Sequence, residues 1–204
     1  MPWDPQQYHQ FQKDRFKPFE DLFGLIKVRE GMRVVDLGCG TGELTRRLAD
    51  RLQGSDVLGV DSSAEMLRRA REQERDGLRF EQASIQEVEG EWDLVFSHAA
   101  IHWIDDHRSL VPRLLSLVSP GGQLAVQLPS NHTHPTHTLI REIALEEPFR
   151  SYLGGWNRAS PVLEINEYAE LLHACGATEI TVFEKVYPSL LENSDAMAEW
   201  TKGT

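Results

Sequence analysis

The chain is poor in cysteine and has no long apolar run, and both features limit what it can be. Its 204 residues include two cysteines, Cys39 and Cys175, too few for the disulfide framework of a small secreted domain. Its beginning lacks the basic and apolar regions of a secretory signal, and no segment approaches the roughly 18 apolar residues of a membrane span. We therefore expect a cytoplasmic protein without a membrane partner.

Positive charge is also scarce. The chain has 21 Lys and Arg against 32 Asp and Glu, which gives a net charge of −11. Nucleic-acid binding needs clustered Lys and Arg that neutralise phosphates, so this balance argues against a nucleic-acid partner. A small soluble substrate fits better. With 40% hydrophobic residues, the length suits one well-filled domain.

Strand-like and helix-like segments alternate along the chain. We expect strands at 33–37, 56–60, 78–82, 92–97 and 123–128, with amphipathic helices such as 43–52 and 64–74 between most of them, and a turn at 119–122. This alternation predicts an α/β fold with a doubly wound, mostly parallel sheet. Residues 1–30 are expected to form a helical lid or cap before the main domain, 31–204.

The end of the first expected strand carries the most informative motif. Gly38, Gly40 and Gly42 alternate with other residues, Cys39 among them, and let the backbone turn tightly and approach a ligand. Their spacing is G-x-G-x-G rather than the dinucleotide pattern G-x-G-x-x-G, which disfavours a nicotinamide-dependent oxidoreductase. Asp36, two residues before Gly38, suits a ligand with an ammonium or sulfonium group, and S-adenosylmethionine carries both. The structural alternative is a turn that only packs a helix onto the sheet.

A second acid, Asp61, ends the second expected strand and could accept hydrogen bonds from ribose hydroxyls. The alternative is that Asp61, Ser62 or Ser63 merely caps the following helix, although one segment can do both. After the third strand, Ser84 could contact an adenine edge. Met66 and Ile85 could sandwich the ring, but a core position is as good an interpretation of Met66.

Polar and aromatic residues follow the fourth expected strand, where chemistry would occur. His98 and His102 could act as a general base, a neutral donor or a cation, while the alternative is a structural histidine and, for Trp103, a core anchor. The histidines at 132, 134 and 137 raise the question of a metal. No carboxylate or cysteine stands beside them at ligand spacing, so we expect no metal site.

These motifs resemble those of the class I S-adenosylmethionine-dependent methyltransferases, which have a Rossmann-like fold, and within them the trans-aconitate methyltransferases. The whole superfamily shares the loop from Asp36 to Gly42. More specific matches are spread over nearly the whole chain: Trp3-Asp4-Pro5, Tyr8, Phe11, Arg15, Pro18, Asp21 and Leu22; Gly59 to Ser63, Met66 and Leu67; Ile101-His102-Trp103, Asp106 and His107; Leu124 to Gln127, Pro129, Asn131, Pro135 to His137, Arg141 and Glu142; and Tyr168, Leu172, Tyr187 and Trp200.

The resemblance implies methyl transfer from S-adenosylmethionine to a carboxylate of trans-aconitate or a similar small polyacid, with S-adenosylhomocysteine as the second product. A carboxylate is already ionised at neutral pH, so His98 and His102 are expected to orient the acceptor and place charge rather than remove a proton. The cofactor-binding residues would be Asp36, Gly38, Cys39, Gly40, Gly42, Asp61, Ser62, Met66, Ser84, Ile85, His98 and Trp103. Those of the acceptor would be Tyr8, Arg15, His102, Asn131, His137 and Arg141, where a solvated helix face is an equal alternative for both arginines.

The chain departs from the family at three points. Ser84 stands where many relatives have Asp, and His102 stands where an enterobacterial type of sequence has Gln. The family also continues past Thr204 into an antiparallel last strand, so the resemblance implies a truncated chain that lacks this strand, with 179–187 as its sixth strand. An exposed edge on the fifth strand would then allow a dimer as well as a monomer.

Other functional classes remain open. A methyltransferase of nucleic-acid amino groups would carry an acid or Asn, paired prolines and an aromatic residue after the fourth strand, which Ser97 to Ala100 lack. A methyltransferase with another small acceptor, or a fold that binds the cofactor without turnover, is the alternative function.

Overall fold

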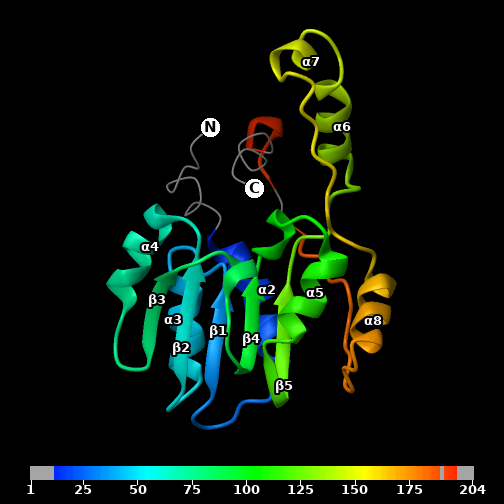
Figure 1. The fold of residues 1–204 in the computed structure, drawn as a ribbon. Helices are drawn as coiled ribbons and strands as arrows, with labels where there is room; N and C mark the ends of the chain where they lie inside the picture. The colour runs from blue at the N-terminus through cyan, green and yellow to red at the C-terminus, as the bar shows by residue number, and fades with distance from the viewer. Residues whose placement is uncertain (1–11, 189–190, 197–204) are drawn as a thin grey trace. The chain divides into compact units, whose positions relative to one another are not determined.

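The computed structural model describes residues 12–188 and 191–196, and the chain divides into two compact units. One unit comprises residues 28–184, and the other comprises 1–27 with 185–204. The larger unit contains a five-stranded, all-parallel sheet with the strand order β3-β2-β1-β4-β5 (Figure 1). Its strands are β1 (Arg33–Leu37), β2 (Asp56–Asp61), β3 (Leu78–Gln82), β4 (Trp92–His98) and β5 (Val118–Gln127).

Helices connect the strands as a doubly wound fold requires. The α-helices of this unit are α3 (Glu43–Arg51), α4 (Ala64–Ala70), α5 (His107–Leu115), α6 (Pro135–Ala144), α7 (Phe149–Tyr152) and α8 (Ile165–Ala174). Short 3-10 helices follow α4, β3 and β4: η1 (Arg71–Gln73), η2 (Ile85–Glu87) and η3 (Ile101–Trp103). The expected α/β fold with its mostly parallel sheet is therefore confirmed.

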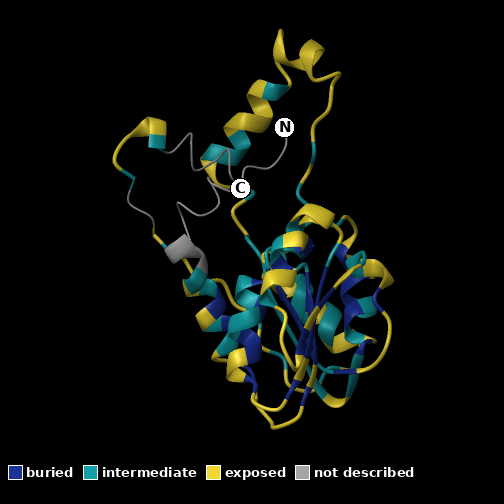
Figure 2. Ribbon diagram, turned by 90° about the vertical axis from the view of Figure 1, so that its left-hand side faces the viewer, coloured by how far each residue is buried: buried dark blue, intermediate teal, exposed yellow. Residues whose placement is uncertain are grey.

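The core lies along the central strands. Residues 34–37 of β1 and 94–97 of β4 are buried on both faces of the sheet, the pattern of parallel strands that helices cover (Figure 2). The carboxyl ends of β1 and β4 position polar residues of the candidate site.

The fifth strand begins earlier than expected. β5 starts at Val118, and the expected turn at 119–122 lies within it as an irregularity: Trp92 pairs with Val118, but Leu94 already pairs with Gln123. Gly121 has a φ of +75°, and a Cβ on Gly122 would lie 2.9 Å from the carbonyl oxygen of Asp93. Glycine therefore lets the strand bulge here without ending it.

A sixth strand at 179–187 was expected, and this prediction is wrong for the described residues. No strand follows β5 in this part of the chain. An extended segment is stabilised as a strand only when its amides and carbonyls pair with a neighbour. Within the described residues, β5 pairs with β4 alone, and 179–187 forms no ladder with it.

Between β5 and α8 the chain forms an arm, residues 129–160, which includes α6 and α7 (Figure 1). Many of its large apolar side chains are exposed: Leu139, Ile140, Ile143, Leu145, Phe149, Tyr152, Leu153 and Trp156. After the arm the chain returns to α8, which packs against α5.

The smaller unit contains α2 (Gln12–Phe23), so a helix is present in the segment where helical spacing was noted. The carboxylate of Asp21 accepts hydrogen bonds from Lys185 Nζ at 2.5 Å and from Tyr187 Oη at 2.6 Å. The bond from Lys185 is the main reason why the pKa of Asp21 is lowered, whereas burial and Asp21 raise the pKa of Tyr187 to about 12. The role of this helix as a lid stays a prediction. Among the described helices, none combines the length and apolar character of a membrane span.

Candidate functional site

The glycine loop is held against the end of β2 by its own backbone. β1 ends at Leu37, and the amides of Gly38 and Cys39 both donate to the carbonyl oxygen of Val60, at 2.8 and 2.9 Å. Gly38, Gly40 and Gly42 have φ values of +81°, +54° and +77°, a region that residues with a Cβ rarely adopt. The motif thus forms the tight turn expected from its sequence.

Two of these glycines serve different purposes. A Cβ on Gly38 would lie 2.2 Å from the Cβ of Ala100 and 3.5 Å from Cδ1 of Ile85, so Gly38 allows the loops after β1, β3 and β4 to meet. A Cβ on Gly40 would meet nothing within 4 Å. Gly40 therefore borders open space into which a ligand can approach the backbone, whereas Gly38 is required by packing.

Asp61 lies beside this loop, as its position at the end of β2 predicts. Its Oδ2 accepts the amide of Gly40 at 2.9 Å, and its Oδ1 accepts the amide of Ser63 at 2.8 Å. A carboxylate offers about four acceptor positions, so further acceptor positions remain for a ligand hydroxyl. Ser63, not Asp61, caps α4, because its Oγ accepts the amide of Met66 at 3.3 Å. The segment from Asp61 to Ser63 thus contains both a helix cap, Ser63, and an acid bound to the glycine loop, Asp61.

Asp36 is nearly fully buried, with 3% of its surface exposed. Burial raises its pKa to about 7; the hydroxyl of Thr45 opposes this rise with a 2.6 Å hydrogen bond to Oδ2, and the charge of Asp61 adds to it. Burial and the two neighbouring carboxylates also raise the pKa of the Cys39 thiol, so this cysteine is not a reactive thiolate. Two acids close together in a partly buried site favour a ligand with positive charge.

The expected adenine contacts come from two elements. Ser84 caps η2: its Oγ accepts the amide of Gln86 at 3.4 Å, which leaves the hydroxyl hydrogen available to a ligand. Ile85 approaches Gly38, and Met66 is half-buried on α4. Ser62 is exposed, and its carbonyl oxygen accepts a 3.0 Å hydrogen bond from Gln82. Ile85 is therefore the member of this group whose contact with the glycine loop is defined.

The residues after β4 surround a local turn. Ser97 is buried and donates from Oγ to the carbonyl oxygen of Leu37 at 2.8 Å, which ties the end of β4 to the end of β1. Half-buried His98 ends β4 and pairs with Gln127 of β5. Ala99 then adopts a φ of +50°, unusual for a residue with a Cβ, and its amide donates to the carbonyl of Gln127 at 2.9 Å.

The alternative of Trp103 as a core anchor is wrong, because 60% of its surface is exposed and Ile101 is the buried residue of η3. The ring of His102 lies 4.8 Å from that of Trp103, centroid to centroid. Burial, together with the charges of Arg158 and His107, lowers the pKa of His102 to about 4. His102 is therefore neutral at neutral pH, so a cationic His102 would need a bound anion that raises its pKa.

His107 connects the site to the helices behind it. It is buried; its Nε2 lies 3.0 Å from the carbonyl oxygen of Ile101, and its Nδ1 forms a short hydrogen bond with the hydroxyl of Tyr168 on α8. In the sequence, both residues stand out only as matches to the methyltransferase family. Their contact fixes η3 against α5 and α8, which is a structural role.

The expected acceptor residues of the arm form a separate group. The carbonyl oxygen of Asn131 accepts the amide of His134, whose own carbonyl accepts the amide of His137, both at 2.9 Å. Burial and the neighbouring histidines lower the pKa of half-buried His137, and Arg141 is exposed on α6. Among the described residues, no hydrogen bond connects this group to the glycine loop or to His102. Tyr8 and the side chain of Arg15 lie outside the described residues.

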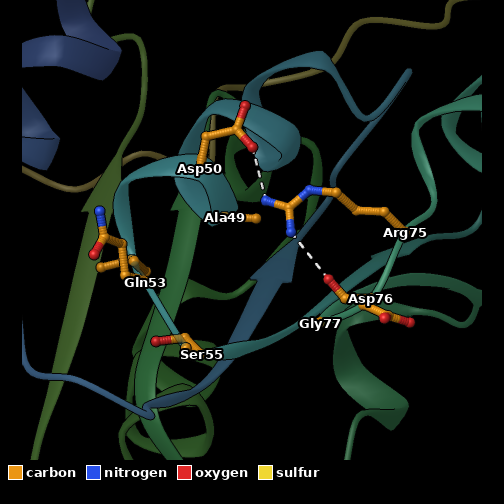
Figure 3. A pocket seen from close by; sticks show the side chains of 9 residues that line it. Ala49, Asp50, Gln53, Ser55, Arg75, Asp76 and Gly77 are labelled. Carbon is orange, nitrogen blue, oxygen red and sulfur yellow. Dashed lines mark hydrogen bonds and ion pairs between the residues drawn. The ribbon is translucent and has the colours of Figure 1, made fainter.

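No set of three or more His, Cys, Asp or Glu side chains in the described part of the chain is arranged to hold a metal ion. A pocket of about 450 Å³ lies elsewhere, between the end of α3, the start of β2 and the turn before β3 (Figure 3). Its cation, Arg75, donates to Asp50 Oδ1 at 2.7 Å and to the carbonyl of Asp76 at 2.9 Å. None of the residues predicted for the site lines this pocket.

The sequence alone predicted no role for Arg158. It follows α7, and its Nη2 donates to the carbonyl oxygen of Trp103 at 2.8 Å and to Oδ1 of Asp105 at 3.0 Å. Its guanidinium also lies 5.8 Å from the centre of the Trp103 ring. No motif surrounds Arg158, so only the fold could bring it to the loop after β4.

Comparison with known proteins indicates the same family as the motifs in the sequence. A protein-family model described as a methyltransferase domain matches residues 28–173. The whole chain is 50% identical to a trans-aconitate 2-methyltransferase of Deinococcus radiodurans and covers 81% of that protein. It is 36% identical over its whole length to the trans-aconitate 2-methyltransferase of Variovorax paradoxus, of which it covers 80%.

Two solved structures share the fold. One is a methyltransferase of Haloferax volcanii in complex with the Trm112 activator, with a TM-score of 0.62 and 22% identity over 98% of this chain and 91% of that chain. The other is phosphoethanolamine N-methyltransferase 2 of Haemonchus contortus in complex with S-adenosyl-L-methionine, with a TM-score of 0.56 and 24% identity over 79% of this chain and 36% of that chain. At these identities the likeness concerns the fold alone.

Proposed function

Because this chain belongs to the S-adenosylmethionine-dependent methyltransferases, with trans-aconitate 2-methyltransferases among its relatives, we propose that it esterifies a carboxylate of a small polyacid such as trans-aconitate. Methyl transfer from S-adenosylmethionine is the activity of the family. The carboxylate as acceptor is our proposal. The observation that carries it is the 50% identity to a trans-aconitate 2-methyltransferase over the whole chain.

The residues around the glycine loop fit this cofactor. Gly40 borders open space, Asp61 keeps acceptor positions for ribose hydroxyls, and Asp36 is a second, buried carboxyl group close by. Bound S-adenosylmethionine supplies an electrophilic methyl group on a positively charged sulfur. We propose that Gly38, Cys39, Gly40 and Gly42 form its backbone cradle. Ser62, Met66, Ser84, Ile85, His98 and Trp103 stay predicted contacts.

The acceptor needs orientation rather than activation. A carboxylate is ionised at neutral pH, so its oxygen can attack the methyl group without a general base. A neutral His102 supports this proposal, because it can donate or accept a hydrogen bond without taking a proton from the acceptor. We propose that His98 and His102 orient the acceptor, and that Tyr8, Arg15, Asn131, His137 and Arg141 are further residues to test.

Mass spectrometry tests the proposal. The protein is incubated with S-adenosylmethionine and a panel of di- and tricarboxylates that includes trans-aconitate, and the products are searched for methyl esters. A methylated polyacid is the expected result. S-adenosylhomocysteine binding without any methylated acid would contradict it, and would favour another acceptor or a fold that binds the cofactor without turnover.

We also propose that the partner is a small acid rather than nucleic acid or membrane; the net charge of −11 argues against binding to nucleic-acid phosphates. A dimer through β5 is a second proposal, because the outer edge of this strand pairs with no other strand among the described residues. Sedimentation of the protein over a range of concentrations distinguishes monomer from dimer. The cytoplasm as the place of action stays a prediction.

A further inference from the structure

Arg158 is a cation beside the proposed acceptor residues, in a protein whose charge is strongly negative. Its side chain is 31% exposed, and it bridges two parts of the larger unit that are far apart in sequence, the segment after α7 and the loop after η3. The ring of Trp103 is close to both groups: its centre is 4.8 Å from that of the His102 ring and 5.8 Å from the Arg158 guanidinium, so both side chains stand beside Trp103. Arg158 therefore lies where an anionic acceptor would be held by His102.

The present partners of Arg158 leave room for a ligand. Both hydrogen bonds come from Nη2, and among the described residues no partner is found for Nε or Nη1. A guanidinium has five N–H donors in a rigid fork that matches a carboxylate. Trp103 supports the guanidinium through its carbonyl oxygen and its ring, so the fork is held in place while part of it stays available.

Asp105 is a replaceable partner. Its side chain is 83% exposed, and ion pairs of such exposed groups contribute little because water solvates both charges. Exchange of Asp105 for a ligand carboxylate would therefore cost little. His102 adds a polar atom to the same place: its Nδ1 is buried and has no hydrogen-bond partner among the described residues. When this nitrogen carries the ring hydrogen, it could donate a hydrogen bond to a carboxylate oxygen of the acceptor.

We propose that Arg158 binds a carboxylate of the acceptor that is not itself methylated, with Asp105 as the group that occupies the guanidinium when the acceptor is absent. This inference rests on the proposed function, because it names the residue that selects acids with more than one carboxylate. A second carboxylate held at Arg158 fixes the orientation of the first one toward the methyl donor.

The test uses steady-state kinetics of the full chain with trans-aconitate, and titration calorimetry of the same acid with protein saturated with S-adenosylhomocysteine. Arg158→Gln is expected to raise KM and Kd about tenfold or more with little change in kcat, because it removes binding that ground and transition state share. Arg158→Lys keeps the charge but not the fork. Its KM and Kd are expected to lie between those of the unchanged protein and those of Arg158→Gln. Arg75→Gln is the matched control, since Arg75 is 36% exposed and paired with Asp50.

Asp105→Asn separates binding from a purely structural role. If Arg158 serves the acceptor, removal of the competing carboxylate lowers KM and Kd severalfold, opposite to Arg158→Gln. If Arg158 only clamps the arm to the loop, both variants weaken the enzyme together, and the proposal is overturned. Unfolding midpoints of all variants identify any that fail to fold, and Arg158→Lys then replaces Arg158→Gln in the comparison.

Different results would overturn the proposed function and the proposed role of Arg158. If the unchanged protein methylates no polyacid, the proposed function fails. If it methylates a polyacid and Arg158→Gln keeps the KM and Kd of Arg75→Gln, only the role of Arg158 is overturned.

Discussion

The hydroxyl of Thr45, in the first turn of α3, donates a 2.6 Å hydrogen bond to Oδ2 of Asp36 at the end of β1. Both residues are buried. This bond satisfies one oxygen of the buried carboxyl group, and it ties α3 to the strand that precedes the glycine loop.

Replacement of Thr45 by Val should therefore destabilise the fold. The shape is kept but the donor is lost, so the free energy of unfolding is expected to fall by about 1–3 kcal/mol. Thr45→Ser, which keeps the hydroxyl, is the control. Urea unfolding measures both variants. Equal stability of Thr45→Val and the unchanged protein would show that the bond to Asp36 contributes nothing.

Asp36 should make stability depend on pH. Its pKa is about 7 in the folded chain, above the ordinary value of 3.8. The folded state thus keeps this proton where the unfolded state releases it, so the contribution is complete below about pH 4 and is lost as pH rises through 7. The total is on the order of 4 kcal/mol. Asp36→Asn should lack this decline, which unfolding from pH 4 to pH 8 can measure. Parallel curves for both proteins would contradict the assignment.

Asp61→Ala should abolish most cofactor binding, because it removes both the expected ribose acceptor and the acceptor of the Gly40 amide. A weakening of tenfold or more is expected in titrations with S-adenosylhomocysteine. Asp56→Ala is the control, since Asp56 is an exposed acid at the other end of β2. Loss of affinity in both variants to the same degree would refute a specific role of Asp61.

His102→Ala should spare cofactor binding and lower the rate of methyl transfer. The side chain is expected to orient the acceptor, not the cofactor, so the two measurements should separate. S-adenosylhomocysteine titration gives the first and product formation gives the second. An equal decrease in cofactor affinity for His102→Ala and Asp61→Ala would defeat this division of labour.

Alanine at the first two glycines of the loop should have different effects. At Gly38 the new Cβ would lie 2.2 Å from that of Ala100, so severe destabilisation is expected. At Gly40 the space is open, so about 1–2 kcal/mol of backbone strain is expected, with a larger loss of cofactor affinity. Gly31→Ala is the control for strain alone, since Gly31 has a φ of +70° and no neighbour within 4 Å. A fully stable Gly38→Ala protein would contradict this account.

Local signals in the sequence were sufficient for most of the sheet. The apolar runs of β1 to β4 are bounded by glycine and polar residues. β1 and β3 therefore begin and end where expected, while β2 and β4 extend one residue beyond the expected end. The start of β5 was missed, since the bulge at 119–122 depends on its pairing with β4. The same limit applies to 179–187, where an extended pattern forms no pairs with the sheet among the described residues.

The cofactor side of the site was also accessible from spacing. Gly40 and Asp61 stand at the ends of neighbouring parallel strands, and this fixes their proximity. The acceptor side of the site could not be predicted from spacing, because it depends on the exposure and the charge state of individual residues. Trp103 lies at the surface instead of in the core, His102 is neutral, and Arg158 reaches Trp103 from 55 residues away. Such long-range contacts leave no pattern in a single sequence.

The close approach of Gly38 and Ala100 limits which substitutions this site can accept in evolution. With Ala100→Gly in place, the nearest neighbours of a new Cβ at position 38 would be at 3.5 Å or more, and only backbone strain would remain. Ala100→Gly should therefore rescue much of the damage of Gly38→Ala. The two substitutions are then tolerated in one order and not in the other, so the loop after β4 determines which routes of divergence are open to the glycine motif.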